Sequence, residues 1–289
     1  MVEQIAPEAA SVALNLRRDD LGDIELQLLL DALMRYGACD FRCFNQAVLR
    51  RRVADAMRAE GVATISGLQE RLLHDERAFA SFVVSMRAGA SQPFGDPALF
   101  EAFVRNVIPL LRTYSFVRVW VPGAGPSADA YTIAALLDEA GLLSRSIVYA
   151  TFVNDASVAI AKAGLYKHNG RAALEANARL AGLEAPLSTY FHVDDEVATP
   201  RDHLRNNVMF ARHNPASDAS INEFHAIVAR GLLPLLNGAA QYRLHSLLFE
   251  SLMHLGFLAL GTGENIAHSA HEGAFRQVSQ EQPIFRRLR

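Results

Sequence analysis

The residues best suited to chemistry lie in one short turn, GAGPS at 123–127, with Asp129 close behind it. The turn follows an apolar run at 117–121 and precedes a run with helical spacing, so we expect a strand, a turn and a helix. Glycines such as Gly123 and Gly125 let a ligand approach the backbone, where the first N–H groups of a helix attract an anion or a nucleotide. Glycines in such a turn also serve tight packing of the helix on the sheet. We favour packing and keep an anion or nucleotide site as the alternative.

Other residue types that often carry catalysis or bind metals lack the necessary spacing. The ten histidines show no HExxH pattern, and no G-x-S-x-G turn presents a serine nucleophile. The two cysteines, Cys39 and Cys43, stand four residues apart without the further ligands that zinc needs. We therefore expect reduced thiols and no metal site, and we assign no catalytic residue.

The overall charge and hydropathy argue against nucleic acid and membrane partners. The net charge is −3 and the isoelectric point is about 6.4, so the chain has no general basic field. The apolar stretch at 247–260 contains Glu250 and His254 and is too short to span a bilayer. The first residues include acids and lack the basic start of a signal peptide. With reduced cysteines, these features predict a cytoplasmic protein.

Local positive charge gathers at Arg50, Arg51, Arg52 and Arg58, with Asp55 as the one internal acid. The run FNQAVLRRRVADAMRAEG has helical spacing, so a helix should carry these side chains. Three consecutive arginines cannot all lie on one side of a helix. A solvated helix face and a contact with an acidic protein partner are both open.

The pattern along the chain predicts two domains. We expect a small helical N-terminal domain at 20–88 and a Gly/Pro-rich link at 89–97. Strand-like runs then alternate with helical runs, which predicts an α/β domain at 98–289 with a Rossmann-like, doubly wound, mainly parallel sheet. The strand-like runs are FVRVWV, SIVYATFV, FHAIVAR and FLALGT. At about 165–213 a helical run and then short strand-like runs, TYFHVDDEV and NVMFARHN, predict a small antiparallel insertion or an edge element.

Five stretches on these elements carry a family resemblance: SQPFGDPALF, RVWVPGAGPSADAYTIA, YATFVNDASVAIAKAGLY, FARHNPASD…EFHAIVARGLLPLLN and GFLALGTGENI. They resemble the CheR-type chemotaxis-receptor methyltransferases, which methylate glutamate side chains of bacterial chemoreceptors with S-adenosylmethionine. SQPFGDPALF resembles the family's T-N-x-T-x-F-F-R-x-x-x-x-F, and RVWVPGAGPSADAYTIA resembles its R-I-W-S-A-G-C-S-T-G-E-E-P-Y-S-I-A. YATFVNDASVAIAKAGLY resembles A-T-D-I-D…L-x-x-A-x-x-G-x-Y. FARHNPASD…EFHAIVARGLLPLLN and GFLALGTGENI resemble F-x-x-x-N-L…F-D-x-I-x-C-R-N-V-x-I-Y-F and G-x-L-x-x-G-H-S-E-N. The resemblance runs from about 24 to 285 and implies a methyltransferase-type fold with a chemoreceptor-like protein partner.

The resemblance also implies where a methyl donor would bind and where the arginine-rich helix would meet its partner. The donor-binding positions are Gly123, Gly125, Asp129, Phe152, Asn154, Asn214 and Arg230. In the family a basic helix at the place of Arg50, Arg51, Arg52 and Arg58 contacts acidic receptor helices, so these four are the candidate partner-binding residues.

Several of the family's functional positions carry other residues here. Phe152 stands where the family has the acid that holds the ribose hydroxyls, and Asn154 or Asp155 could replace that acid. Gly95 stands for the arginine beside the donor, and Gly231 for the asparagine of C-R-N. The Thr and Asn that open the first motif are Ala88 and Gly89, the tyrosine after C-R-N is Leu235, and the turn keeps one acid of two.

The missing contacts are large enough to change the expected function. A hydrogen bond to a charged group contributes ~1.5–3 kcal/mol, so loss of the ribose acid implies roughly 10- to 150-fold weaker binding. We therefore favour a CheR-like protein of bacterial sensory signalling that is catalytically degenerate. It would bind S-adenosylmethionine or S-adenosylhomocysteine weakly or not at all, and act by binding partners or an altered ligand. The alternative is an active S-adenosylmethionine-dependent protein-glutamate O-methyltransferase with a rebuilt pocket.

Overall fold

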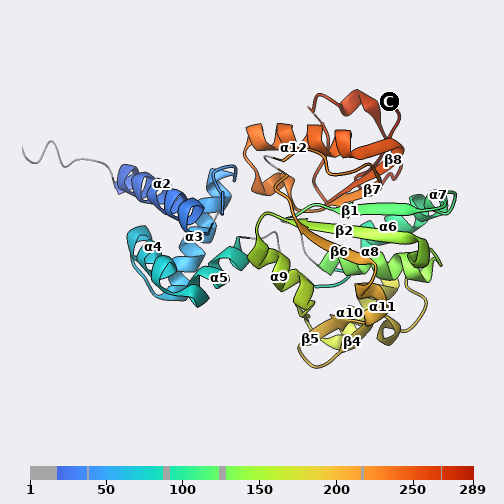
Figure 1. The fold of residues 1–289 in the computed structure, drawn as a ribbon, viewed down its shortest axis with the longest axis horizontal. Coiled ribbons are helices and arrows are strands. Elements are labelled where there is room, and N and C mark those ends of the chain that lie inside the picture. The colour runs from blue at the N-terminus through green and yellow to red at the C-terminus, as the bar shows by residue number, and fades with distance from the viewer. Residues whose placement is uncertain (1–17, 38, 87–91, 124–127, 216–217, 268) are drawn as a thin grey trace, which may run out of the picture. The chain divides into compact units, whose positions relative to one another are not determined.

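The chain forms two compact units in a computed structural model that describes residues 18–37, 39–86, 92–123, 128–215, 218–267 and 269–289 (Figure 1). The first unit comprises Met1–Arg42 with Gln46–Met86, and the second comprises Cys43–Asn45 with Arg87–Arg289. The predicted helical part and α/β part are therefore both present, and each is described by itself below.

The first unit consists of helices in its described part: α2 (Arg18–Gly37), α3 (Gln46–Glu60), α4 (Ile65–His74) and α5 (Glu76–Ser85). Gly61 follows α3 with a φ of 67°, a left-handed conformation that glycine adopts easily at the end of a helix. The Asp75 side chain accepts hydrogen bonds from the Arg77 and Ala78 N–H groups, so it caps α5 immediately after α4. The core contains Leu29, Leu33, Leu68, Leu72 and Phe82.

The second unit is built on a seven-stranded sheet with the order β6-β2-β1-β7-β8-β10-β9. Its strands are β1 (Val117–Val121), β2 (Ser146–Phe152), β6 (Val208–Arg212), β7 (Phe224–Ala229), β8 (Leu252–Leu260), β9 (Phe275–Gln277) and β10 (Ile284–Arg287). The strands from β6 to β8 are parallel, and β10 is antiparallel to both of its neighbours. The mainly parallel sheet expected from the strand–helix alternation is confirmed.

Helices accompany this sheet: α6 (Pro97–Asn106), α7 (Ile108–Leu111), α8 (Ala128–Glu139), α9 (Asp155–Ala163), α11 (Asp202–Arg205) and α12 (Gly238–Ser251). The first ten residues of α8 are all buried, as expected for a helix that is apolar on nearly every side. Val119 and Val121 of β1 join the same core as α8, whereas Trp120 stacks on Phe224 of β7. Alternate residues of β1 therefore contribute to two different packing layers.

A small antiparallel sheet is inserted between α9 and β6, with the order β3-β5-β4. Its strands are β3 (Tyr166–Lys167), β4 (Phe191–Val193) and β5 (Val197–Pro200), and α10 (Arg171–Leu180) lies between β3 and β4 in the chain. The run NVMFARHN gives β6, which pairs in parallel with β2 and is the edge strand of the large sheet. Of the two possibilities for this region, the first part is an insertion and the last part is an edge element.

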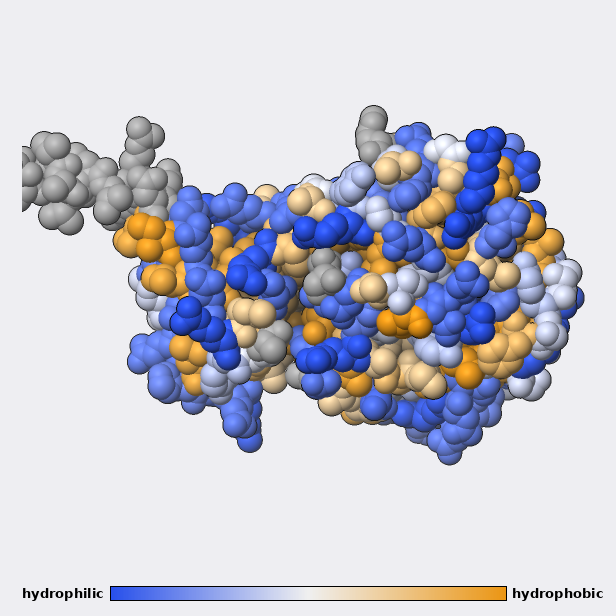
Figure 2. All heavy atoms as spheres, turned by 45° about the horizontal axis from the view of Figure 1, so that its top comes forward, coloured by the Kyte–Doolittle hydropathy of each residue, from blue (hydrophilic) through white to orange (hydrophobic). Residues whose placement is uncertain are grey.

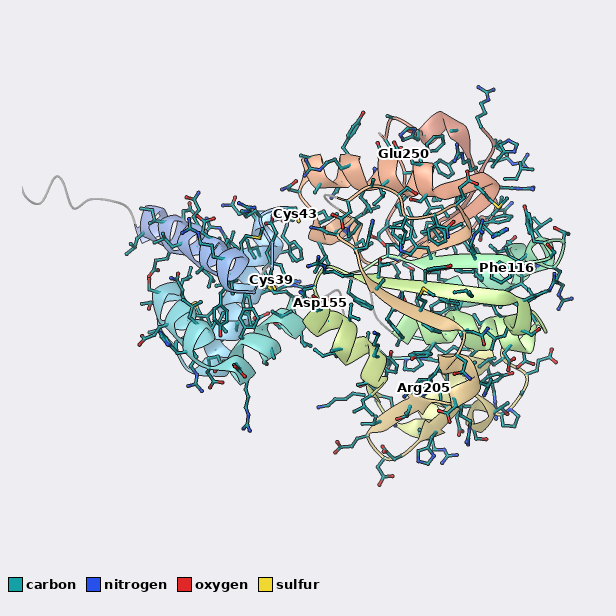
Figure 3. The ribbon with its side chains drawn as sticks, in the orientation of Figure 1. Cys39, Cys43, Phe116, Asp155, Arg205 and Glu250 are labelled. Carbon is teal, nitrogen blue, oxygen red and sulfur yellow. The ribbon has the colours of Figure 1, made fainter. Side chains whose placement is uncertain are left out.

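Arg205 ties the inserted sheet to α9. Its guanidinium donates to the carbonyl oxygens of Lys162 and Ala163, the last residues of α9, at 3.0 and 3.2 Å, and to Pro200 O at 3.0 Å. Arg205 thus lies at the C-terminal end of α9, opposite Asp155 at its start (Figure 3). A cation at this position stabilises the helix, because the last carbonyl groups carry partial negative charge.

Candidate functional site

Gly123 lies two residues after the end of β1, beside the end of β2. A Cβ atom at this position would lie 1.7 Å from the Thr151 carbonyl oxygen, so a larger residue requires the backbone to move. This contact supports the packing interpretation for Gly123. Gly125, with the rest of the turn at 124–127, lies outside the described residues.

Asp129 and Arg230 form a buried ion pair between α8 and the end of β7. The Arg230 Nε and Nη2 atoms donate to the two Asp129 carboxylate oxygens at 2.9 and 2.7 Å. The Asp129 side chain is 1% exposed and that of Arg230 is 15% exposed. Burial raises the pKa of the Asp129 carboxyl, and the Arg230 guanidinium opposes that rise. Two residues predicted from separate motifs are therefore bound to each other.

Gly95 lies beside this pair. A Cβ atom on Gly95 would lie 3.5 Å from Arg230 Nη2, so the Arg230 guanidinium approaches the place where the family has an arginine side chain. The next residue, Asp96, caps α6 through Leu99 N at 3.3 Å and accepts a hydrogen bond from the Thr262 hydroxyl at 3.3 Å. Arg230 is thus the guanidinium that the chain places beside residues 95–96.

Phe152 is a core residue at the end of β2. Its side chain is 3% exposed, and its ring stacks on Phe210 of β6 with the ring centroids 6.2 Å apart. Asn154 is buried two residues later, and its side-chain oxygen accepts a hydrogen bond from Ser157 N at 2.8 Å as the cap of α9. Asp155 is the first residue of that helix, labelled in Figure 3. The strand end therefore presents an aromatic ring and a helix cap where the family has two acids.

Asn214 lies in a loop that begins at the end of β6. Its backbone N–H donates to the Asp218 carboxylate at 2.8 Å, and Asp218 N donates back to Asn214 O at 2.8 Å. The preceding residue, His213, is buried, packs edge-on against Trp120, and is 2.9 Å from Ala219 O through Nε2. Sequence reasoning missed His213, because a single histidine beside a motif carries no spacing signal; its burial and its contact with Trp120 exist only in the fold.

Glu264 links the loops that follow β7 and β8. Its carboxylate accepts hydrogen bonds from Gly231 N, Leu233 N and Gly261 N at 2.7, 2.8 and 2.6 Å. Burial raises the pKa of the Glu264 carboxyl, and the three N–H donors oppose that rise. Glu264 therefore satisfies three backbone N–H donors at the edge of the site, which is a structural role.

The arginine-rich helix is α3, and most of its charges have partners within the first unit. Arg50 forms an ion pair with Asp23 of α2, and Arg58 forms one with Asp55. Arg52 donates to the Ser85 carbonyl oxygen at 2.8 Å. Arg51 is exposed and has no ion pair among the described residues. Among the four predicted partner-binding arginines, Arg51 differs from the other three in forming no side-chain ion pair or hydrogen bond with the described residues.

The first unit also exposes apolar side chains on one side of α2. Leu21, Ile24 and Leu28 are each about half exposed, and their spacing places them on one face of the helix. Orange spheres gather at the surface of the helical unit in Figure 2. Cys39 and Cys43, labelled in Figure 3, are not joined to each other by a disulfide bond.

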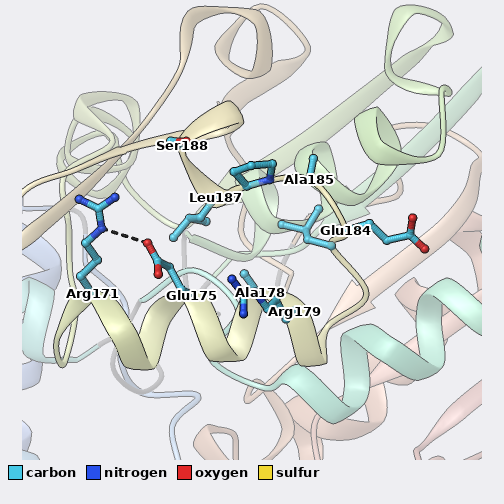
Figure 4. Close-up of a pocket in the computed structure, with 10 residues that line it drawn as sticks. Arg171, Glu175, Ala178, Arg179, Glu184, Ala185, Leu187 and Ser188 are labelled. Carbon is cyan, nitrogen blue, oxygen red and sulfur yellow. Dashed lines mark hydrogen bonds and ion pairs between the residues drawn. The ribbon is translucent and has the colours of Figure 1, made fainter.

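A hollow of about 200 Å³ lies between α10 and residues 183–188 (Figure 4). Arg171 lines it and donates to Glu175 at 2.9 Å, and Arg179 and Glu184 add one further charge of each sign. Its charges balance, so they select neither an anion nor a cation.

In the described part of the chain, no three His, Cys, Asp or Glu side chains come together in a way that could hold a metal ion. None of the described helices is both long and apolar enough to cross a bilayer.

Comparisons with known proteins agree with this architecture. Residues 90–284 match the family model described as the CheR methyltransferase SAM binding domain, and residues 24–86 match the CheR methyltransferase all-alpha domain. The chain is 37% identical over 265 residues to "Putative methyltransferase Cher3" of Pseudomonas putida, covering 92% of this chain and 97% of that protein. It is 21% identical to a chemotaxis protein methyltransferase of Listeria monocytogenes, covering 81% of this chain and 87% of that one.

A similar solved structure is the glycopeptide N-methyltransferase MtfA complexed with sinefungin, with a TM-score of 0.33 and 16% identity. The match covers 60% of this chain and 50% of that one. An uncharacterised 104.1 kDa protein of Rhodobacter capsulatus is 26% identical, and the chain spans 27% of its length. The two family models together span both units, and on that ground the chain belongs to the CheR methyltransferase family.

Proposed function

We propose that this chain is a catalytically degenerate CheR-family protein that binds S-adenosylmethionine weakly or not at all and acts in the cytoplasm by binding protein partners in bacterial sensory signalling. The observation that carries the proposal is Phe152. It stands where the resembled family has its ribose-binding acid, and its ring is packed into the core against Phe210. An aromatic ring cannot accept the ribose hydroxyl hydrogen bonds.

The neighbouring polar residues support the proposal because they already serve the fold. Asn154 caps α9, and Asp129 is bound at both carboxylate oxygens by Arg230. A donor that recruited Asp129 would have to displace a buried guanidinium, and the residues described here therefore do not fit the donor well. Methyl transfer depends largely on holding donor and acceptor in line, so a poorly held donor gives little catalysis.

Titration calorimetry with S-adenosylhomocysteine tests the proposal. A Listeria chemotaxis protein methyltransferase, measured in parallel, is the comparator. Loss of one hydrogen bond to a charged group predicts at least about a tenfold weaker Kd than the comparator, and loss of two moves it beyond about 100-fold. A Kd equal to that of the comparator refutes the proposal and favours the active methyltransferase with a rebuilt pocket.

Arg51 supplies the clearest charge for a partner contact on α3. We propose that Arg51 contacts an acidic surface on a chemoreceptor signalling helix. Arg50 and Arg58 have intramolecular acidic partners, so their charges contribute less. In a pull-down with a chemoreceptor signalling fragment, Arg51→Glu should weaken binding more than Arg58→Glu does. Added salt should weaken the binding of the unchanged protein, because it screens the charges. Equal binding by Arg51→Glu and the unchanged protein contradicts this assignment.

A further inference from the structure

Phe94 has an unusual backbone conformation for a large residue. Its φ is 54°, in the left-handed region, and its side chain is fully buried. Bulky residues rarely adopt this conformation, and it persists where surrounding contacts hold it. The Phe94 N–H donates to the Thr132 hydroxyl of α8 at 3.0 Å, and the ring packs edge-on against Phe191 with centroids 5.9 Å apart. Contacts on both sides therefore hold Phe94 in place.

Phe191 belongs to the inserted sheet, as the first residue of β4. It is fully buried, so the contact with Phe94 is part of the core. The preceding residue, Tyr190, docks elsewhere: its hydroxyl donates to Glu139 at the C-terminal end of α8, at 2.6 Å. Two adjacent residues of the insertion thus make different contacts, Phe191 with Phe94 and Tyr190 with the end of α8.

The residues after Phe94 reach the Asp129–Arg230 pair. The Cβ position of Gly95 lies 3.5 Å from Arg230 Nη2, and Asp96 binds Thr262 and caps α6. The same hydroxyl that holds Phe94 N donates to Ala128 O, adjacent in sequence to Asp129. Residues 94–96, here called the strap, therefore lie between the inserted sheet, which Phe94 contacts, and the ion pair, whose Arg230 guanidinium lies beside Gly95.

We propose that the strap couples the inserted sheet to the Asp129–Arg230 pair, so that a displacement of β4 alters the position of the charged residues beside Gly95. The physical reason is that a close-packed core cannot absorb a displacement of Phe191 without moving the Phe94 ring. Phe94 sits in a strained conformation, so its release shifts Gly95 against the Arg230 guanidinium. This inference goes beyond the proposed function and does not depend on whether the donor binds.

A double-mutant cycle on the full chain tests the coupling. The variants are Phe191→Leu, Arg230→Lys and the two together, unfolded by urea and followed by the fluorescence of Trp120, the single tryptophan. Distant substitutions without shared partners multiply their effects on the unfolding equilibrium constant. If the sites are coupled, the change in the unfolding equilibrium constant of the double variant differs by more than about threefold from the product of the two single-variant changes. Agreement within about threefold overturns the proposal. Phe191→Met replaces Phe191→Leu if the latter does not fold.

Tyr190→Phe is the matched control, because it alters the neighbouring residue but not the ring contact with Phe94. Its effect should multiply with that of Arg230→Lys. Amide hydrogen exchange gives a second measurement. The Phe94 amide should exchange at least about tenfold faster in Phe191→Leu, where its surroundings loosen, and at an unchanged rate in Tyr190→Phe. Unchanged exchange of Phe94 in Phe191→Leu also overturns the proposal.

Discussion

The buried ion pair predicts a large and specific loss of stability when its acid is neutralised. In Asp129→Asn the shape of the side chain is kept, but the Arg230 guanidinium loses its counter-charge while only 15% exposed. Removal of one partner of a buried pair lowers the free energy of unfolding by about 3–5 kcal/mol. Because Arg230 keeps some exposure to solvent, we expect a loss of about 3 kcal/mol. A solvated surface pair would contribute only about 0–1 kcal/mol. The two cases are therefore well separated.

Urea unfolding followed by Trp120 fluorescence measures this loss in the second unit, because Trp120 is buried in β1. Far-ultraviolet circular dichroism confirms that the variant starts folded. The double variant Asp129→Asn with Arg230→Met is the control, and it should lose less stability than Asp129→Asn, since no unpaired charge remains buried. A loss below about 1 kcal/mol in Asp129→Asn would refute the reasoning, because it would place the pair in the range of solvated ion pairs.

Three further outcomes follow from individual contacts. Gly123→Ala places a methyl group 1.7 Å from the Thr151 carbonyl oxygen and should lower the free energy of unfolding by about 3 kcal/mol or more, and an unchanged urea midpoint would contradict this. Arg205→Ala removes three hydrogen bonds to carbonyl oxygens and should cost about 1–3 kcal/mol, with hydrogen exchange in the last turn of α9 faster than in the unchanged chain. Burial lowers the pKa of His225, whose ring also accepts a hydrogen bond from Arg118 N. As the pH falls, the imidazole is therefore protonated in the unfolded chain before it is protonated in the folded chain. His225 leaves the free energy of unfolding unchanged above a pH of about 6.5 and lowers it as the pH drops below that value. His225→Asn should flatten this fall in urea midpoints, and an equally steep fall would exclude His225 as its source.

The strands β1, β2 and β7 and the helices of the first unit could be predicted from the sequence, because apolar periodicity directly records which side of an element is buried. The C-terminal strands β9 and β10 have no such signal in the sequence. They are three and four residues long, too short to show a period. They exist as strands because β10 pairs with the edge of β8 and β9 pairs in turn with β10.

The assignment of Gly123, Asp129, Phe152 and Arg230 to one site came from the resemblance to the CheR family, because local periodicity does not show which strand ends lie together. Their partners were decided by the tertiary structure. Asp129 and Arg230 are separated by 101 residues, and their pairing depends on how β7 lies beside β1. The reason Gly123 must be glycine is a carbonyl oxygen on a neighbouring strand, and the conformation of Phe94 is held by a ring from the inserted sheet. Periodicity encodes burial along one segment, whereas these contacts join segments whose proximity only the packed fold creates.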